Sequence, residues 1–100
     1  MFVLDIGEGA GALVVYTGRQ LKDAEVEISF DDGGPPHKFH TGVVERTIDG
    51  RPAWAAVFPS LRAGRYTFWR PQPLPLSGVK VVAGAVTELD WRPDGYLAGR

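Results

Sequence analysis

The chain has 100 residues, 44% of them hydrophobic. A chain of this length predicts one domain that buries roughly 60 to 70% of its unfolded surface in a single core. The absence of cysteine excludes a disulfide framework, a thiolate nucleophile and a cysteine metal site. Eleven basic and 12 acidic residues give a net charge of -1, so the charge favours neither nucleic acid nor a membrane as a partner.

Residues 2–6 and 12–17 are apolar runs separated by a glycine-rich stretch, residues 7–11. A phosphate-binding loop must lie between a strand and the start of a helix, whereas residues 13–17 are rich in β-branched side chains and predict a strand. The glycines therefore predict a bulge or tight turn in or before the first strand. Because no basic leader precedes an apolar core here, we expect a cytoplasmic protein.

Residues 25–30 alternate strictly between apolar and polar side chains, which is typical of a half-buried strand. We expect the apolar set to face the core. Glu25 and Glu27 then share the solvated face, and without a cleft to desolvate them they are not predicted to act as an acid–base pair.

Residues 31–38 contain two glycines and two prolines and predict the longest loop. In and beside this loop lie four oxygen and nitrogen ligands suited to a divalent cation, Asp31, Asp32, His37 and His40. An extended chain would place the two imidazoles on opposite faces. Ordinary surface groups on a loop are therefore the first interpretation, and a metal site is an alternative.

Residues 41–48 predict a further strand, although the adjacent Val43 and Val44 interrupt its alternation. Asp49-Gly50 follows, and this dipeptide is the strongest hairpin signal in the chain. It predicts that the strand turns back antiparallel onto residues 53–58.

Residues 54–69 supply more core material than any other stretch of similar length. Apolar side chains two residues apart on each arm predict two strands. Pro59 cannot donate to a ladder and Gly64 adopts positive φ readily, so we expect a turn over residues 59–64. Leu61 lies within that turn, and we expect it to close one end of a sandwich.

Trp69 has the opposite parity from Tyr66 and Phe68, so it faces solvent if those two face the core. This makes it the best candidate for an exposed contact residue. The predicted contact residues are Trp69, Arg70, Trp54, Trp91 and Arg65. Tryptophans of this kind stack on sugars or on partner side chains. The alternative is that one or two of them cover the edges of the core.

The C-terminal part of the chain begins with the proline-rich residues 70–76, which predict a stiff, extended connection between sheets. Residues 79–82 and 85–91 predict a final hairpin about Ala83-Gly84. Residues 1–92 are therefore expected to form a single domain, followed by a tail over residues 93–100.

Three segments carry a resemblance to a known family. Residues 58–67 resemble the aromatic, leucine, glycine, tyrosine signature of carboxypeptidase regulatory-like, transthyretin-like and collagen-adhesin B-type domains. Residues 20–28 and 79–90 resemble the upstream alternating strand and the closing hairpin of these domains. The resemblance implies an all-β fold, a seven-stranded Greek-key sandwich of the prealbumin type. Such a fold hosts many functions and implies little about this one.

Catalysis finds little support in the sequence, and we predict that the protein is not an enzyme and needs no cofactor. The three serines lie in no nucleophile elbow, and the C-terminal residues 96–100 do not match the motif of the hydrolases that share the transthyretin fold. We predict a non-catalytic binding or assembly module that contacts another protein, or itself, through a sheet edge or the region around Trp69. Carbohydrate or small-ligand binding on the tryptophans is the alternative, and a metal site at residues 31–40 is the second.

Overall fold

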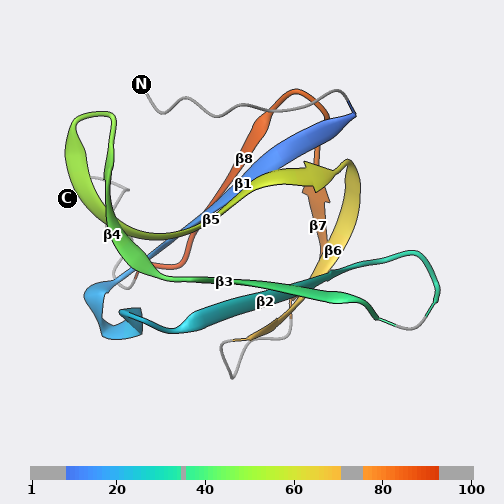
Figure 1. Cartoon of the computed structure of the whole chain (residues 1–100), viewed down its shortest axis with the longest axis horizontal. Coiled ribbons are helices and arrows are strands. Elements are labelled where there is room, and N and C mark those ends of the chain that lie inside the picture. The colour runs from blue at the N-terminus through green and yellow to red at the C-terminus, as the bar shows by residue number, and fades with distance from the viewer. Residues whose placement is uncertain (1–8, 35, 71–75, 93–100) are drawn as a thin grey trace.

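The computed structural model describes residues 9–34, 36–70 and 76–92. These residues form two four-stranded sheets, sheet A with the strand order β4-β5-β1-β8 and sheet B with the order β3-β2-β6-β7 (Figure 1). The strands of sheet A are β1 (Ala10–Thr17), β4 (Val44–Ile48), β5 (Arg51–Arg62) and β8 (Val86–Asp90). Those of sheet B are β2 (Glu25–Phe30), β3 (Lys38–Gly42), β6 (Gly64–Arg70) and β7 (Leu76–Val81). The described residues include no α-helix, only the short 3₁₀ turn η1 (Arg19–Leu21), so the predicted all-β sandwich is confirmed.

The core lies between the two sheets and takes side chains from both. Leu13 of β1, Ile28 of β2 and Phe68 of β6 are completely buried, and Tyr66 is 1% exposed. On β6 Tyr66 and Phe68 alternate with more exposed residues, as expected for a strand with one face on a core, whereas on β2 Ser29, which follows Ile28, is also buried (2% exposed). The prediction that Tyr66 and Phe68 point inward is confirmed.

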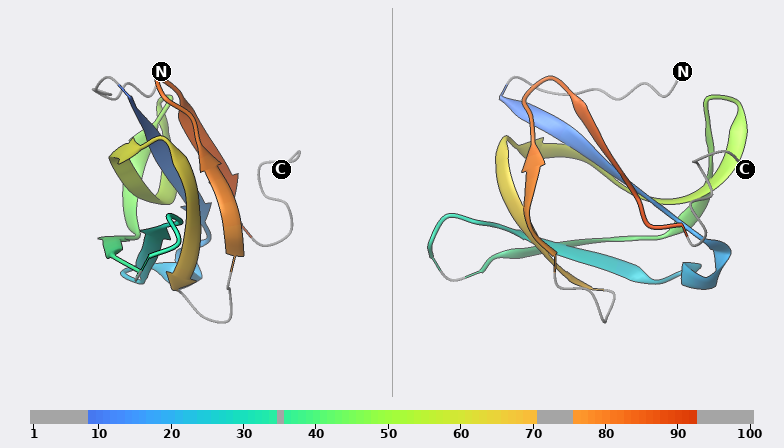
Figure 2. Two further views of the ribbon diagram at one scale, coloured as in Figure 1. Left: turned by 90° about the vertical axis from the view of Figure 1, so that its right-hand side faces the viewer. Right: turned by 180° about the vertical axis from the view of Figure 1, so that it is seen from behind.

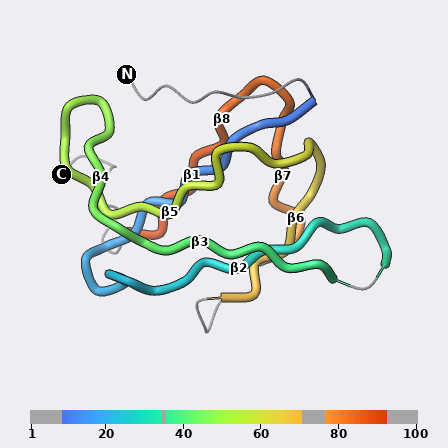
Figure 3. The backbone as a smooth tube through the Cα atoms, in the orientation of Figure 1, coloured from blue at the N-terminus to red at the C-terminus, as the bar shows by residue number. Residues whose placement is uncertain are grey.

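The single strand predicted over residues 41–48 is part of two strands that lie in different sheets. β3 pairs with β2 and β4 pairs with β5, so the chain passes from one sheet to the other between β3 and β4 (Figure 3). Val43 is completely buried, its N–H donates to the Ala24 carbonyl (2.8 Å), and its carbonyl accepts the Asp23 N–H (3.0 Å). Val44, 41% exposed, already belongs to β4. This corner is why the described residues form eight strands instead of the seven expected.

The connection between β5 and β6 is shorter than the turn expected over residues 59–64. β5 continues to Arg62 and β6 begins at Gly64. Between the pairs Leu13↔Phe58 and Gly11↔Leu61, β5 has one residue more than β1, so the register shifts here. This β-bulge accommodates a proline, which has no N–H for the ladder. Leu61 is 7% exposed and belongs to the core, as expected.

The hairpin predicted over residues 79–91 is wrong. β7 pairs with β6 in sheet B, whereas β8 runs parallel to β1 in sheet A (Figure 2). The turn between β7 and β8 carries the chain from one sheet to the other and bonds to β1. Gly84 N–H donates to the Ala10 carbonyl (2.8 Å), and Ala12 N–H donates to the Ala85 carbonyl (2.9 Å). Alternating side chains predict a strand, but they do not say which sheet the strand joins.

Sheet A also carries an apolar cluster on the face that points away from sheet B. Its buried members, none more than 8% exposed, are Val14, Tyr16, Ile48, Ala55 and Val57. Val14 alternates with Leu13 and Val15 of the main core, so β1 is buried on both faces. A strand buried on both faces is typically an unbroken apolar run, as residues 12–16 are.

Other predictions fall at the ends and turns of these strands. Asp49 and Gly50 form the expected β4–β5 turn, both with positive φ (53° and 78°). The register of β1 against β5 shifts between Gly11 and Leu13, but the extra residue lies in β5; of the bulge or tight turn expected in or before the first strand, the structure describes Gly9, which has a positive φ (75°) just before β1. Most of the proline-rich connection of residues 70–76 and the whole tail of residues 93–100 lie outside the described residues.

Candidate functional site

The predicted contact tryptophans do not share one surface. Trp54 and Trp91 are half-buried and pack against the main core. The Trp91 ring meets the Phe68 ring edge to face, with centroids 5.2 Å apart. Trp69 lies on the outer face of sheet B and is 38% exposed. A sugar platform built from all three tryptophans is therefore not formed, and Trp69 alone faces outward from sheet B.

Trp69 lies within a polar network on the outer face of sheet B. Its indole Nε1–H donates to the Ser29 hydroxyl (2.9 Å), and the Lys38 Nζ lies 4.6 Å from the ring centroid. Glu27 lies between two cations, with its carboxylate 3.9 Å from Lys38 Nζ and 3.7 Å from Arg70 Nε. Cation–π and charged contacts of this kind orient the indole instead of leaving it free. Arg70 and Trp69, both predicted contact residues, thus lie side by side in one charged region.

Arg65, the remaining predicted contact residue, is exposed on β6 opposite Lys80 of β7. Its Nη1 lies 3.4 Å from the Gly78 carbonyl. It therefore lies at the β7 side of sheet B, in a different register position from Trp69 and Arg70.

The four candidate metal ligands point in different directions. Asp31 accepts a hydrogen bond from a threonine hydroxyl of β6 (2.7 Å), and Asp32 accepts one from a backbone N–H of its own turn (2.8 Å). The His40 ring lies 3.3 Å from a glutamate of β2, whereas His37 packs edge to face against the side chain of Phe39. Within the described ranges, no three His, Asp or Glu side chains gather in a way that would hold a metal ion.

β3 is an edge strand of sheet B and exposes backbone groups. Val43 N–H donates to the Ala24 carbonyl of the neighbouring chain segment, and the register continues unbroken through the pairs Val26↔Thr41 and Ile28↔Phe39. Because backbone groups of an antiparallel strand alternate in direction, Thr41 and Phe39 also bond toward β2. The N–H and C=O groups of His40, which lies between them, and of Lys38, which precedes Phe39, therefore point away from β2.

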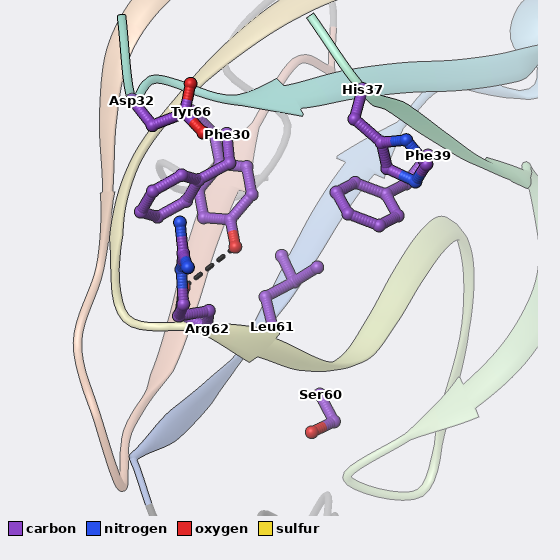
Figure 4. A pocket seen from close by; sticks show the side chains of 8 residues that line it. All are labelled: Phe30, Asp32, His37, Phe39, Ser60, Leu61, Arg62 and Tyr66. Carbon is purple, nitrogen blue, oxygen red and sulfur yellow. Dashed lines mark hydrogen bonds between the residues drawn. The ribbon is translucent and has the colours of Figure 1, made fainter. Parts of the chain in front are cut away.

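An open pocket of about 420 Å³ lies next to the first residues of β3, between the ends of the two sheets (Figure 4). Its lining comes from β2, β3, β5, β6 and the loop after β2. The lining residues are Phe30, Asp32, His37, Phe39, Ser60, Leu61, Arg62 and Tyr66. We call it the aromatic pocket, because three of these eight side chains are phenyl or phenol rings. Phe39 is 38% exposed, so one wall is open to solvent.

Stacked side chains build one wall of the aromatic pocket. The Phe30 and Tyr66 rings meet edge to face at 5.3 Å, and the Arg62 guanidinium carbon lies 3.7 Å from the centre of the Phe30 ring. The Tyr66 hydroxyl donates to the Arg62 carbonyl (2.8 Å), as the dashed line in Figure 4 shows. Burial raises the pKa of Tyr66, and the nearby Arg62 cation opposes that rise. Tyr66 is therefore a neutral hydrogen-bond donor at pH 7 and not a base.

Most residues of the aromatic pocket were not among the candidates from the sequence. The sequence predicts Asp32 and His37 only as metal-ligand candidates, and Phe30, Leu61 and Tyr66 only as core residues. Phe39 lies in a Lys-Phe-His run whose period-two pattern is too short to stand out from the preceding loop. Phe30 and Arg62 meet because β2 and the end of β5 meet in space, which local spacing does not show.

No protein-family model, no curated protein and no solved structure matches this chain. The residues that the structure describes contain no helix long and apolar enough to cross a membrane.

Proposed function

We propose that this chain is a non-catalytic protein-binding module, a β-sandwich of the prealbumin type that contacts its partner by strand addition to β3. The topology supports a fold of the prealbumin type. Strands β1 and β8 of sheet A run parallel, and in sheet B β2 lies between β3 and β6 in the order β3-β2-β6-β7. The resemblance of residues 20–28 and 58–67 to carboxypeptidase regulatory-like and transthyretin-like domains agrees with it.

The observation that carries this proposal is that, among the strands the structure describes, β3 has a partner only on its β2 side. Lys38 and His40 direct their backbone N–H and C=O groups away from β2, and an extended partner segment satisfies such groups by adding a strand. β7, at the other edge of sheet B, is a poorer template. It contains Gly78 at φ +74°, and its register against β6 shifts between Tyr66 and Phe68.

The outer face of sheet B extends the proposed contact beyond the edge. Trp69 and Arg70 lie across β2 from β3, and the Lys38 side chain reaches over the Trp69 ring. Large aromatic and arginine side chains supply most of the binding energy in many protein interfaces. A partner strand on β3 would therefore meet both the backbone edge and this charged face.

The backbone contact is tested with two substitutions at one position. A displayed library of random linear peptides is selected on the wild-type chain, and binding of the selected peptides is then measured for His40→Pro and His40→Ala. Proline removes the outward N–H of an edge strand, where it is tolerated, and we expect at least about a tenfold loss of affinity. Alanine keeps that N–H and loses only the imidazole, so we expect affinity within about threefold of wild type.

Two results would contradict the proposal. One is that no peptide is selected, and the other is that His40→Pro binds as well as His40→Ala while both variants keep the wild-type circular dichroism spectrum. The carbohydrate alternative places its contact on Trp69. A glycan array on which wild type and Trp69→Ala give the same signal would dispose of it.

A further inference from the structure

We infer that the aromatic pocket is the specificity pocket of the β3 edge, and that the partner segment supplies a large apolar side chain with a carboxylate beside it. This inference rests on the proposed strand addition. It goes further, because it assigns the chemistry of the partner segment and names the residues that recognise this segment, Phe39 and Arg62.

The position of the pocket along β3 is the first step. Phe39 lines the pocket and, as the pair Ile28↔Phe39 shows, lies on the core side of sheet B. Side chains of paired strands lie on the same face at directly opposite positions. The partner residue opposite Phe39 therefore points toward the pocket, while its two neighbours point to the outer face with Lys38 and His40.

The pocket lining indicates which kind of side chain the partner residue opposite Phe39 carries. Phe39, Phe30 and Leu61 present carbon to the space, and Tyr66 has its hydroxyl bonded to the Arg62 carbonyl. A volume of about 420 Å³ lies within the range of roughly 300 to 1,000 Å³ typical of ligand pockets. An aromatic or long aliphatic side chain of the partner fits this lining. It would cover the apolar side chain of Phe39, which is 38% exposed.

The charges at the pocket define the second feature of the partner. The Arg62 guanidinium lies over the Phe30 ring, and within the described ranges no carboxylate lies within ion-pair distance of it. Asp32, by contrast, already accepts a backbone hydrogen bond from Gly34 (2.8 Å). A planar guanidinium held in place with unused N–H groups binds a carboxylate with two parallel hydrogen bonds. The pocket therefore favours an anion over a cation.

The pocket is tested directly with small probes, without a partner. Phenylacetate, benzylamine and acetate are each titrated into the full chain, and the backbone amide signals of Phe39, Leu61 and Arg62 are followed by NMR. We expect phenylacetate to shift these signals in a saturable way, with affinity at least about tenfold above that of benzylamine and of acetate. Equal binding of phenylacetate and benzylamine, or no shift with phenylacetate, would overturn the inference.

A charge reversal provides the matched comparison. Arg62→Glu is expected to reverse the preference, so that benzylamine binds more tightly than phenylacetate. Arg65→Glu makes the same change on an exposed arginine three residues later, on β6, that does not line the pocket, and it is expected to leave the preference for phenylacetate unchanged. If Arg62→Glu still prefers phenylacetate, Arg62 does not bind the carboxylate and the inference is wrong.

The peptides selected on the wild-type chain separate this inference from the proposed function. We expect them to share a large apolar residue with Asp or Glu two positions away, on the same face of the added strand, and to lose binding to Arg62→Glu. Peptides that depend on the β3 edge but bind Arg62→Glu as well as wild type would overturn the inference and leave strand addition standing. If peptides bind independently of His40→Pro, strand addition falls, and the partner assignment falls with it.

Discussion

At the scale of single residues, Gly64 is the position where backbone and side chain constrain each other most closely. Its φ is +149°, and a Cβ built on it would lie 2.5 Å from the edge of the Phe30 ring. Phe30 in turn supports both Tyr66 and the Arg62 guanidinium. The absence of a side chain at this one position therefore allows the stacked wall of the aromatic pocket to form.

Gly64→Ala is expected to lower the free energy of unfolding by about 2 to 3 kcal/mol, because it adds overpacking to backbone strain. Gly50→Ala is the control. Gly50 also has positive φ (+78°), but nothing lies within 4 Å of its built Cβ, so strain alone predicts a loss of about 1 kcal/mol. Urea denaturation of the two variants provides the measurement. Equal losses would mean that contact with Phe30 has no part in the requirement for glycine.

At the scale of elements, the corner at Val43 determines where the edge of sheet B ends. Val43 and Val44 are adjacent and chemically identical, yet the first is completely buried and the second is 41% exposed. Val43→Ala is expected to cost about 2 kcal/mol, since it leaves a cavity where two sheets meet. Val44→Ala should stay within about 0.5 kcal/mol of wild type. Thermal or urea unfolding of the pair measures this difference, and similar losses would place the corner elsewhere.

The same corner explains how far the sequence could predict these elements. Strict alternation predicted β2, and the Asp49-Gly50 dipeptide predicted the β4–β5 turn, because each is a local property. The passage between sheets at Val43 depends on hydrogen bonds to residues about twenty positions away in the chain, and alternation carries no sign of it. The crossing between β7 and β8 was missed for the same reason.

The candidate site was predicted less completely than the fold. Trp69 was placed on the outer face by its parity, and the structure has it there. The aromatic pocket needed the ends of β2, β3 and β5 to be brought together, and its key contact, Arg62 over Phe30, joins residues from both sheets. A site at the junction of several elements becomes visible only when their register is known.

At the scale of the whole molecule, the two apolar layers each contain a tyrosine. Tyr66 belongs to the layer between the sheets and Tyr16 to the layer on the outer face of sheet A. Burial raises the pKa of Tyr16, and its hydrogen bond to Glu88 (2.5 Å) and the charge of Glu88 raise it further, while Arg92 opposes the rise. Burial also raises the pKa of Tyr66. Both layers therefore stabilise a neutral phenol.

These shifts predict that the fold loses stability at alkaline pH. Unfolded tyrosine has a pKa of about 10, so above that pH the unfolded chain has released protons that the folded chain still holds, and the free energy of unfolding falls as pH rises. Below about pH 9 both states are protonated and this contribution is constant. Urea denaturation from about pH 8 to about pH 11 measures the fall, and Tyr16→Phe and Tyr66→Phe should each remove part of it. A curve that stays flat above pH 10, or that neither variant changes, would show that the two layers do not hold these phenols away from water.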